Sequence, residues 1–320
     1  MECNEGEMIK NKKIAVVIPS YKVKTHLKDV VLNLPEFVDF IIVIDDKCPQ
    51  KSYEEVENLE KIYIVHHKIN QGVGGAVVSG YKKAIELNSD IVIKIDGDGQ
   101  MDSNYILPLI TPLLENKADY TKGNRFRDFK ALKSMPKVRL FGNSVLSFLI
   151  KMASGYWSMM DPTNGFTAIT KQTLIDLDLD KLSKRYFFES DMLINLNIEN
   201  KVIKDISIPA KYGEEESSLD IKKVALKFPP KIIKGLSKRL FLKYFIYNFN
   251  MASIYMVLGI PLFVFGVVFG AIEWCNSIQT NIETPTGTIM LSVLPIIIGV
   301  EFLLQAINID IMSEPKEKRE

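Results

Sequence analysis

The segment 91–102, Ile-Val-Ile-Lys-Ile-Asp-Gly-Asp-Gly-Gln-Met-Asp, carries two carboxylates that are separated by a single residue. Its β-branched run is typical of a buried strand and its glycines of a turn, so Asp96 and Asp98 should stand at the carboxyl end of a strand. Open α/β sheets bind ligands at that end. Two carboxylates at this spacing can share Mg²⁺ or Mn²⁺, which would neutralise the phosphates of a nucleotide. Asp98 is the expected direct ligand and Asp96 the residue nearer the nucleotide; a solvated acidic turn is the alternative.

The elements before this segment alternate between strand and helix patterns. Apolar runs predict strands at 14–18, 40–44 and 62–65, the first stopped by Pro19, with a helix over 25–34 between the first two. Such alternation predicts an α/β fold with a parallel sheet. The second strand ends in Asp45-Asp46, which places two more acids at the carboxyl edge of the sheet.

A glycine-rich stretch follows the third strand. Asn70-Gln71-Gly72-Val73-Gly74-Gly75-Ala76 leads into a helix that runs to about Leu87. Glycines before a helix let backbone N–H groups approach a phosphate or sugar closely. The stretch has neither the Walker spacing nor the dinucleotide fingerprint after the first strand. It therefore indicates close packing beside a ligand, with tight docking of the helix as an equal alternative.

Length and composition fit one sizeable domain with a smaller part attached: 320 residues, 47% hydrophobic, 25% charged, net charge +1. Three distant cysteines, Cys3, Cys48 and Cys275, indicate neither a disulfide framework nor a zinc site, and they fit a reducing compartment. The N-terminus lacks the features of a secretory signal, so the N-terminal portion should stay in the cytosol. No nucleic-acid partner is expected.

Four blocks then stand in a characteristic order. They are Val-Val-Ile-Pro-Ser-Tyr, Val-Ile-Asp-Asp, the glycine-rich stretch and Ile-Asp-Gly-Asp-Gly-Gln. Together they resemble the inverting family-2 glycosyltransferases of GT-A fold, most closely the polyprenyl-phosphate branch, which includes dolichol-phosphate mannose synthases and undecaprenyl-phosphate glucosyltransferases. The resemblance covers about the first two thirds of the chain. It implies a GT-A Rossmann-like mixed sheet flanked by helices.

The resemblance implies a donor side of the site. Its residues would hold the nucleotide through Pro19, Tyr21, Asp45, Asp46, Gly75, Asp96 and Gln100, and Mg²⁺ or Mn²⁺ through Asp96, Asp98 and Gln100. Two positions depart from the family: Val23 replaces a glutamate, and Lys47-Cys48 replaces Gly-Ser. Both departures lie near the expected base pocket, so the nucleotide stays open.

The resemblance also implies an acceptor side. Arg125 and Arg139, with Lys211, are the candidates for gripping a lipid phosphate, because guanidinium matches phosphate oxygens in a planar fork. Asp161, in Asp-Pro-Thr-Asn-Gly-Phe, would receive a proton from the nucleophile or orient it; an Asx turn before proline is the alternative. Glu189 ranks after Asp161 and would serve the acceptor side or favour a helix N-terminus.

The C-terminal third has a membrane pattern. Residues 222–243 combine an apolar stripe with lysines, as in a basic amphipathic helix on an anionic membrane surface, and aromatic residues gather over 241–249. Two uncharged or nearly uncharged runs, about 251–273 and 287–309, are long enough to span a bilayer, and Glu301 interrupts the second. An acid within the bilayer usually faces protein or an interface.

Lysine and arginine flank both ends of this hairpin, whereas the loop 273–286 has none, so the positive-inside rule places both termini and the catalytic domain in the cytosol. The expected plan is a GT-A domain over 1–219, amphipathic interface helices over 220–249, and a two-helix transmembrane hairpin with a short tail over 250–320. The protein would be a multi-pass membrane protein, of the cell membrane if prokaryotic.

These patterns and the resemblance predict a metal-dependent inverting glycosyltransferase that moves one hexose from a nucleotide sugar to a polyprenyl phosphate. UDP-glucose is the first expected donor, with GDP-mannose or a UDP-N-acetylhexosamine as alternatives. A homo-oligomer, plausibly a tetramer, is expected from relatives. The alternative functions are a noncatalytic membrane-anchored scaffold that keeps the fold and a polysaccharide synthase, which would need several more spans and a Gln-x-x-Arg-Trp block that this chain lacks.

Overall fold

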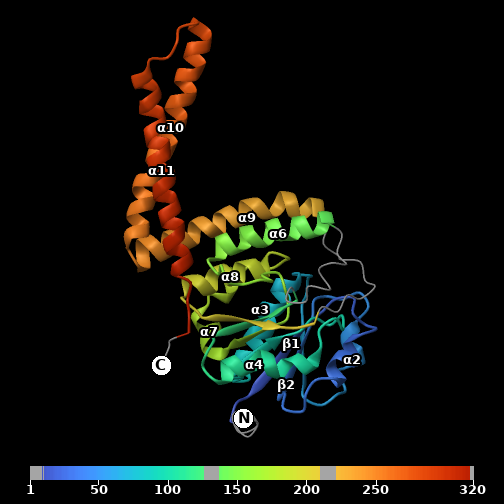
Figure 1. Ribbon diagram of the computed structural model, residues 1–320. Coiled ribbons are helices and arrows are strands. Elements are labelled where there is room, and N and C mark those ends of the chain that lie inside the picture. The colour runs from blue at the N-terminus through green and yellow to red at the C-terminus, as the bar shows by residue number, and fades with distance from the viewer. Residues whose placement is uncertain (1–8, 10, 126–136, 210–220, 318–320) are drawn as a thin grey trace. The chain divides into compact units, whose positions relative to one another are not determined.

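A computed structural model describes residue 9 and residues 11–125, 137–209 and 221–317, with the backbone alone for 137–141, 143 and 221–226. The chain divides into two compact units (Figure 1). One comprises residues 1–236 and 315–320, and the other comprises residues 237–314.

The first unit is built on a seven-stranded sheet with the strand order β3-β2-β1-β4-β6-β5-β7. The four strands from β3 to β4 are parallel, β6 is antiparallel to both of its neighbours, and β5 pairs with β7 in parallel. This confirms a mixed α/β sheet. The strands are β1 (Ile14–Ser20), β2 (Phe40–Asp45), β3 (Ile62–His66), β4 (Ile91–Lys94), β5 (Tyr120–Asn124), β6 (Thr167–Thr170) and β7 (Ile203–Ser207).

Helices cover both faces of the sheet (Figure 1). Ile14 and Val16 of β1 belong to one apolar core and Ala15 and Val17 to another, because successive side chains point to opposite faces. Burial on both faces explains why the strands read as continuous apolar runs. Helices α2 (Leu27–Leu32) and α4 (Ile106–Leu114) close the first core, and α3 (Val73–Glu86), α7 (Lys171–Asp176) and α8 (Phe188–Ile198) close the second.

The prediction that Pro19 stops the first strand was wrong, because β1 continues to Ser20. Beyond Val17 the strand pairs only with β2. The Val17 carbonyl accepts a hydrogen bond from the Ile95 N–H on the β4 side, whereas the Ser20 carbonyl accepts one from the Asp46 N–H on the β2 side. Since residues alternate between the two sides, the nitrogen of Pro19 faces the side on which β4 has ended, and no ladder hydrogen bond is lost.

Helix α6 (Lys137–Ser154) packs on α8. In α9 (Ile221–Phe241), the Phe228 ring meets Phe187, the residue before α8, edge to face with centroids 5.4 Å apart. The short helical turns are η1 (Ser52–Glu55), η2 (Ser103–Tyr105) and η3 (Leu179–Lys181). Helix α9 covers most of the range 222–243, for which the sequence predicts a basic amphipathic helix.

The second unit is a helical hairpin of α10 (Met251–Thr280) and α11 (Thr286–Met312), preceded by the π-helical segment η4 (Leu242–Tyr247). Both long helices are apolar enough to cross a membrane. Arg239 is fully buried and pairs with Asp310 through two hydrogen bonds of 2.7 and 2.9 Å, and the Tyr244 hydroxyl donates a third to the same carboxylate. This polar cluster ties the segment before α10 to the end of α11. Glu301 is exposed on α11 and accepts a hydrogen bond from Gln305.

Candidate active site

The carboxyl ends of four neighbouring parallel strands define one edge of the sheet. Ser20 ends β1, Asp45 ends β2, His66 ends β3, and Asp96 follows β4 by two residues. Polar side chains that are distant in the sequence are thereby gathered along that edge, as expected for a ligand site in an open sheet.

A cavity of about 150 Å³ opens beside the end of β4. It joins Asp96, Asp98 and Gln100 to Arg125, which directly follows β5, so four of the residues predicted from the sequence line one space. The remaining lining comes from Met101, Asp102, Tyr105, Thr163, Asn164, Gly165, Phe166, Ile208 and Pro209. The lining does not include Pro19, Tyr21, Asp45, Asp46, Gly75, Asp161 and Glu189.

The turn after β4 fixes its carboxylates through local hydrogen bonds. Asp98 Oδ1 accepts from the Gln100 N–H at 3.0 Å, and Asp102 Oδ1 accepts from the Asn104 N–H at 3.1 Å. Within the described residues, no group of three or more His, Cys, Asp or Glu side chains could hold a metal ion. The oxygen donors still fit Mg²⁺ or Mn²⁺, because such ions are commonly held by one or two carboxylates together with substrate phosphates.

Lys94, the last residue of β4, is a buried cation beneath this turn. Its Nζ lies 2.7 Å from Asp96 Oδ1 and 3.7 Å from Glu189 Oε1, and its side chain is 2% exposed. Burial acts to lower the pKa of Lys94, but the carboxylates of Asp96 and Glu189 outweigh it, so the pKa lies above its ordinary value. Lys94 therefore stays charged and holds Asp96 and Glu189 together.

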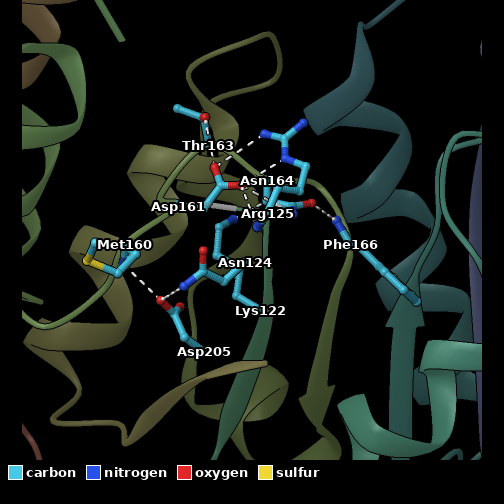
Figure 2. A network of polar contacts seen from close by, with 9 residues as sticks. All are labelled: Lys122, Asn124, Arg125, Met160, Asp161, Thr163, Asn164, Phe166 and Asp205. Carbon is cyan, nitrogen blue, oxygen red and sulfur yellow. Dashed lines mark hydrogen bonds and ion pairs between the residues drawn. The ribbon is translucent and has the colours of Figure 1, made fainter. Parts of the chain in front are cut away.

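Asp161 faces Arg125 and is fully buried (Figure 2). Arg125 Nε donates to Asp161 Oδ2 at 2.8 Å and Arg125 Nη2 donates to Oδ1 at 3.2 Å, which is the bidentate geometry of a strong charge-assisted pair. Thr163 and Asn164 add longer contacts to the same carboxylate. The arrangement orients the guanidinium of Arg125 at the wall of the cavity.

A second buried lysine supports the same segment from below. Lys122 is fully buried, and its ammonium donates to the Asn164 carbonyl. Burial lowers the pKa of Lys122 to about 8, against the attraction of the carboxylates of Glu189 and Asp161. Asp205 accepts hydrogen bonds from Asn124 and from the Met160 N–H (Figure 2), and burial raises its pKa.

Asp45 and Asp46 hold the loops that follow β2 and β3. Asp46 is 3% exposed; its oxygens accept from the N–H groups of Gln71 and Gly72 at 2.7 and 2.8 Å, and its Oδ1 lies 2.7 Å from His67 Nδ1. Asp45 accepts from the Cys48 N–H at 2.8 Å and lies 3.1 Å from His66 Nδ1. Tyr21, just beyond the end of β1, is 43% exposed.

The glycine-rich stretch packs against protein in this structure. A Cβ atom at Gly74 would lie 2.3 Å from the Ser183 carbonyl and 2.7 Å from Phe188 Cβ, so only glycine permits this approach. The Gly75 N–H donates to the Lys184 carbonyl at 2.9 Å. The contacts favour tight docking of α3. They also tie α3 to the segment 183–188, which leads directly to Glu189 in the first turn of α8.

Two candidates for the lipid phosphate cannot be placed. Arg139 lies on α6, but its side chain is outside the described residues, and Lys211 lies outside them entirely.

The site includes three residues that sequence analysis did not single out, Lys94, Lys122 and His67. His67 is 5% exposed and bridges Asp46 to Ser79, with Nε2 2.8 Å from the Ser79 hydroxyl. Each of these residues carried a signal, because a charged or polar side chain inside a strand pattern, or just after one, must find a partner when the strand is buried.

Comparisons with known proteins agree with this architecture. Residues 15–177 match the sequence profile described as glycosyl transferase family 2. A UDP-N-acetylglucosamine–dolichyl-phosphate N-acetylglucosaminyltransferase from Methanococcus voltae is 34% identical over 61% of this chain and 86% of the relative. A dolichol-phosphate mannosyltransferase from Pyrococcus furiosus is 22% identical over 63% of this chain and 56% of the relative.

Among solved structures, glucosyl-3-phosphoglycerate synthase from Mycobacterium tuberculosis is similar in fold. Its complex with Mn²⁺, UDP and glucosyl-3-phosphoglycerate aligns with a TM-score of 0.56 and 16% identity, over 75% of this chain and 85% of that chain. At this identity the likeness concerns the fold alone. It confirms the GT-A-like mixed sheet with flanking helices.

Proposed function

Because the chain belongs to glycosyl transferase family 2, we propose that it transfers one hexose or N-acetylhexosamine from a nucleotide sugar to a polyprenyl phosphate, with inversion. One observation carries this proposal: a single cavity is lined both by the carboxylates of Asp96 and Asp98 and by Arg125. The first group suits a cation and a diphosphate, and the second suits an acceptor phosphate.

In the proposed reaction, Asp98 and Gln100 hold the donor diphosphate through a divalent cation, and Asp96 lies beside them. When bound, the cation supplies positive charge to the leaving diphosphate. Arg125, held by Asp161, aligns the acceptor phosphate. A phosphate oxygen is already anionic near neutral pH, and the bidentate contact of Asp161 with Arg125 supports an orienting role for this carboxylate over a proton-accepting one.

The donor is proposed to be a UDP sugar. A relative with 34% identity is named as a UDP-N-acetylglucosamine transferase, so we place UDP-N-acetylglucosamine ahead of UDP-glucose and GDP-mannose. The acceptor is proposed to be a polyprenyl phosphate because three relatives carry dolichyl, dolichol or undecaprenyl phosphate in their names. Two apolar helices in the chain supply a means of holding it at the membrane that contains such lipids.

The test is transfer by the full chain in detergent. Each of the three nucleotide sugars, labelled in the sugar, is incubated with polyprenyl phosphate and Mg²⁺ or Mn²⁺, and label in the lipid extract is measured. We expect one sugar per lipid with one preferred donor, and loss of transfer on chelation of the metal. No labelled lipid from any donor would contradict the proposal, and a polymer would indicate a polysaccharide synthase instead.

The substitution Asp98→Asn should lower kcat/KM by about 100-fold or more, because it removes a carboxylate ligand of the divalent cation that stabilises the leaving diphosphate. Asp178→Asn is the matched control, since Asp178 is an exposed carboxylate that pairs only locally with Lys181. Equal activity of the two variants would contradict the role of Asp98 in holding the cation.

A further inference from the structure

The contact between Lys94 and Asp96 restricts what Asp96 can bind. The Lys94 ammonium lies 2.7 Å from Asp96 Oδ1, and the Lys94 side chain is almost fully buried. Lys94 is the last residue of β4, which pairs with β1 on one side and with β6 on the other. Glu189 approaches the same ammonium to 3.7 Å from α8. One oxygen of Asp96 is thus engaged in a buried ion pair before any ligand arrives.

The segment that carries Asp161 closes over this pair. Gly165 lies directly above it: a Cβ atom built there would be 2.3 Å from Lys94 Nζ and 2.8 Å from Asp96 Oδ2. The Asn164 carbonyl next to it is held by the Lys122 ammonium. Because Gly165 lies against both side chains and Lys94 is almost fully buried, the ammonium has little room to leave Asp96.

The positive charge of Lys94 changes the electrostatics of the metal site. The ammonium offsets the negative charge of Asp96, and it repels a metal cation that would bind the same carboxylate. The described residues offer no cluster of three acidic, histidine or cysteine side chains that would replace Asp96. A divalent ion at Asp98 therefore needs oxygen atoms from another source, and the diphosphate of the nucleotide supplies them.

We propose that Lys94 is a positioning residue that makes metal binding depend on the nucleotide, by keeping Asp96 in an ion pair and out of the metal's coordination sphere. The cation then binds through Asp98 together with the donor diphosphate and not to the protein alone. This inference rests on the proposed function for the identity of the ligands, but its consequence concerns binding and not transfer.

The experiment measures Mn²⁺ binding to the full chain in detergent, by the loss of the electron paramagnetic resonance signal of free Mn²⁺. Wild-type protein should bind Mn²⁺ weakly in the absence of UDP, and its affinity for Mn²⁺ should rise by about tenfold or more when UDP is present. Lys94→Met frees Asp96 for the metal, so affinity without nucleotide should rise about tenfold, and the effect of UDP should shrink. A residue that merely supported the fold would not tighten metal binding when removed.

Lys201→Met is the matched control, because it also removes a mostly buried ammonium that pairs with a carboxylate, that of Asp176 on α7, but one outside the site. It should leave Mn²⁺ affinity without nucleotide unchanged. If Lys94→Met does not fold, Gly165→Ala tests the same point, because its methyl group would overlap the ends of the Lys94 and Asp96 side chains and displace them from their present contact.

Unchanged Mn²⁺ affinity in the folded variant, equal tightening by Lys201→Met, or nucleotide-independent binding to the wild type would each overturn the inference. Failure of the proposed function is seen separately, as Mn²⁺ and UDP binding by the wild type without any sugar transfer.

Discussion

Lys94 and Lys122 occupy one row of the sheet. Thr167 of β6 pairs with Lys94 on one side and with Lys122 on the other, so the three side chains project from neighbouring strands toward the face covered by α3 and α8. Two buried ammonium groups are costly unless they are paired. Glu189, Asp96 and the Asn164 carbonyl supply the partners, which explains why residues of three distant segments meet here.

The low pKa of Lys122 predicts a pH-dependent stability. Because its folded-state value of about 8 lies below the ordinary value of 10.5, the folded protein binds this proton less well than the unfolded chain. The resulting penalty is complete below about pH 8 and disappears as the pH rises toward 10.5; it amounts to at most about 3 kcal/mol.

The stability of the wild type relative to Lys122→Met should therefore increase between pH 8 and pH 10. Thermal melting of both proteins in the same detergent, at each pH, isolates this group because the other titrating residues are common to both. A difference that does not change with pH would mean that Lys122 titrates normally.

Asp161 and Arg125 should act as one unit. If Asp161 works by orienting Arg125, then Asp161→Asn and Arg125→Lys each lower kcat/KM for the polyprenyl phosphate, and the double variant is no worse than the poorer single one. Initial rates over a range of acceptor concentrations give the coupling energy, which should exceed about 1 kcal/mol. Independent, multiplying effects would point instead to a separate proton-accepting role for Asp161.

At the scale of elements, the position of the site depends on how closely α3 approaches β1. A Cβ atom at Gly80 would lie 2.2 Å from Val17 Cγ1, so the helix rests on the central strand through a position without a side chain. That contact fixes how close the start of α3 lies to the sheet. The glycine-rich stretch before α3 is in turn held at the edge of the sheet by its hydrogen bonds to Asp46.

Gly80→Ala should destabilise the first unit by about 1–3 kcal/mol, because the methyl group overpacks the interface between helix and sheet. Gly142→Ala on α6 is the matched control: a Cβ atom there meets nothing within 4 Å, and better helix propensity should stabilise by up to about 1 kcal/mol. Melting temperatures in detergent should shift in opposite directions, and a loss of similar size in both variants would contradict the packing argument.

At the scale of the whole molecule, the two apolar helices lead to a prediction about topology. Cys275 is free and exposed on α10. At 1.5 Å per residue it lies about 35 Å from Met251, beyond a hydrocarbon core of about 30 Å. If the chain spans the membrane with its basic flanks in the cytosol, Cys275 is on the opposite side.

In intact cells, a membrane-impermeant maleimide should label the wild type but not Cys275→Ser. A cysteine introduced by Lys316→Cys into the double variant Cys3→Ser/Cys275→Ser, whose remaining Cys48 is buried, should react only after permeabilisation, because Lys316 belongs to the basic tail. Labelling of the Lys316→Cys protein in intact cells would reverse the proposed orientation.

Much of the molecule could be predicted from local pattern. Strand and helix positions in the first unit follow from apolar runs and glycine turns, and the two long helices of the second unit follow from the absence of charge. The acids after β2 and β4 were placed at one edge because parallel strands end at the same side of a sheet.

The chemical setting of those acids was not predictable in the same way. Asp46 and Asp161 are engaged by His67 and Arg125, residues that lie 21 and 36 positions away in the chain. Lys94 looked like an isolated charge in an apolar strand until α8 brought Glu189 to it.

The sequence by itself determined the approximate positions of the helices and strands, the glycosyltransferase motifs and which residues could carry charge. These features depend on side-chain type and on spacing along the chain. Only the tertiary structure decided which charges neutralise one another, because that depends on the antiparallel insertion of β6 between β4 and β5 and on the packing of α8 over the sheet. Those two features bring Lys94, Lys122 and Glu189 together, and the pairing of Lys94 with Asp96 follows from burial, where a charge without a partner is too costly to keep.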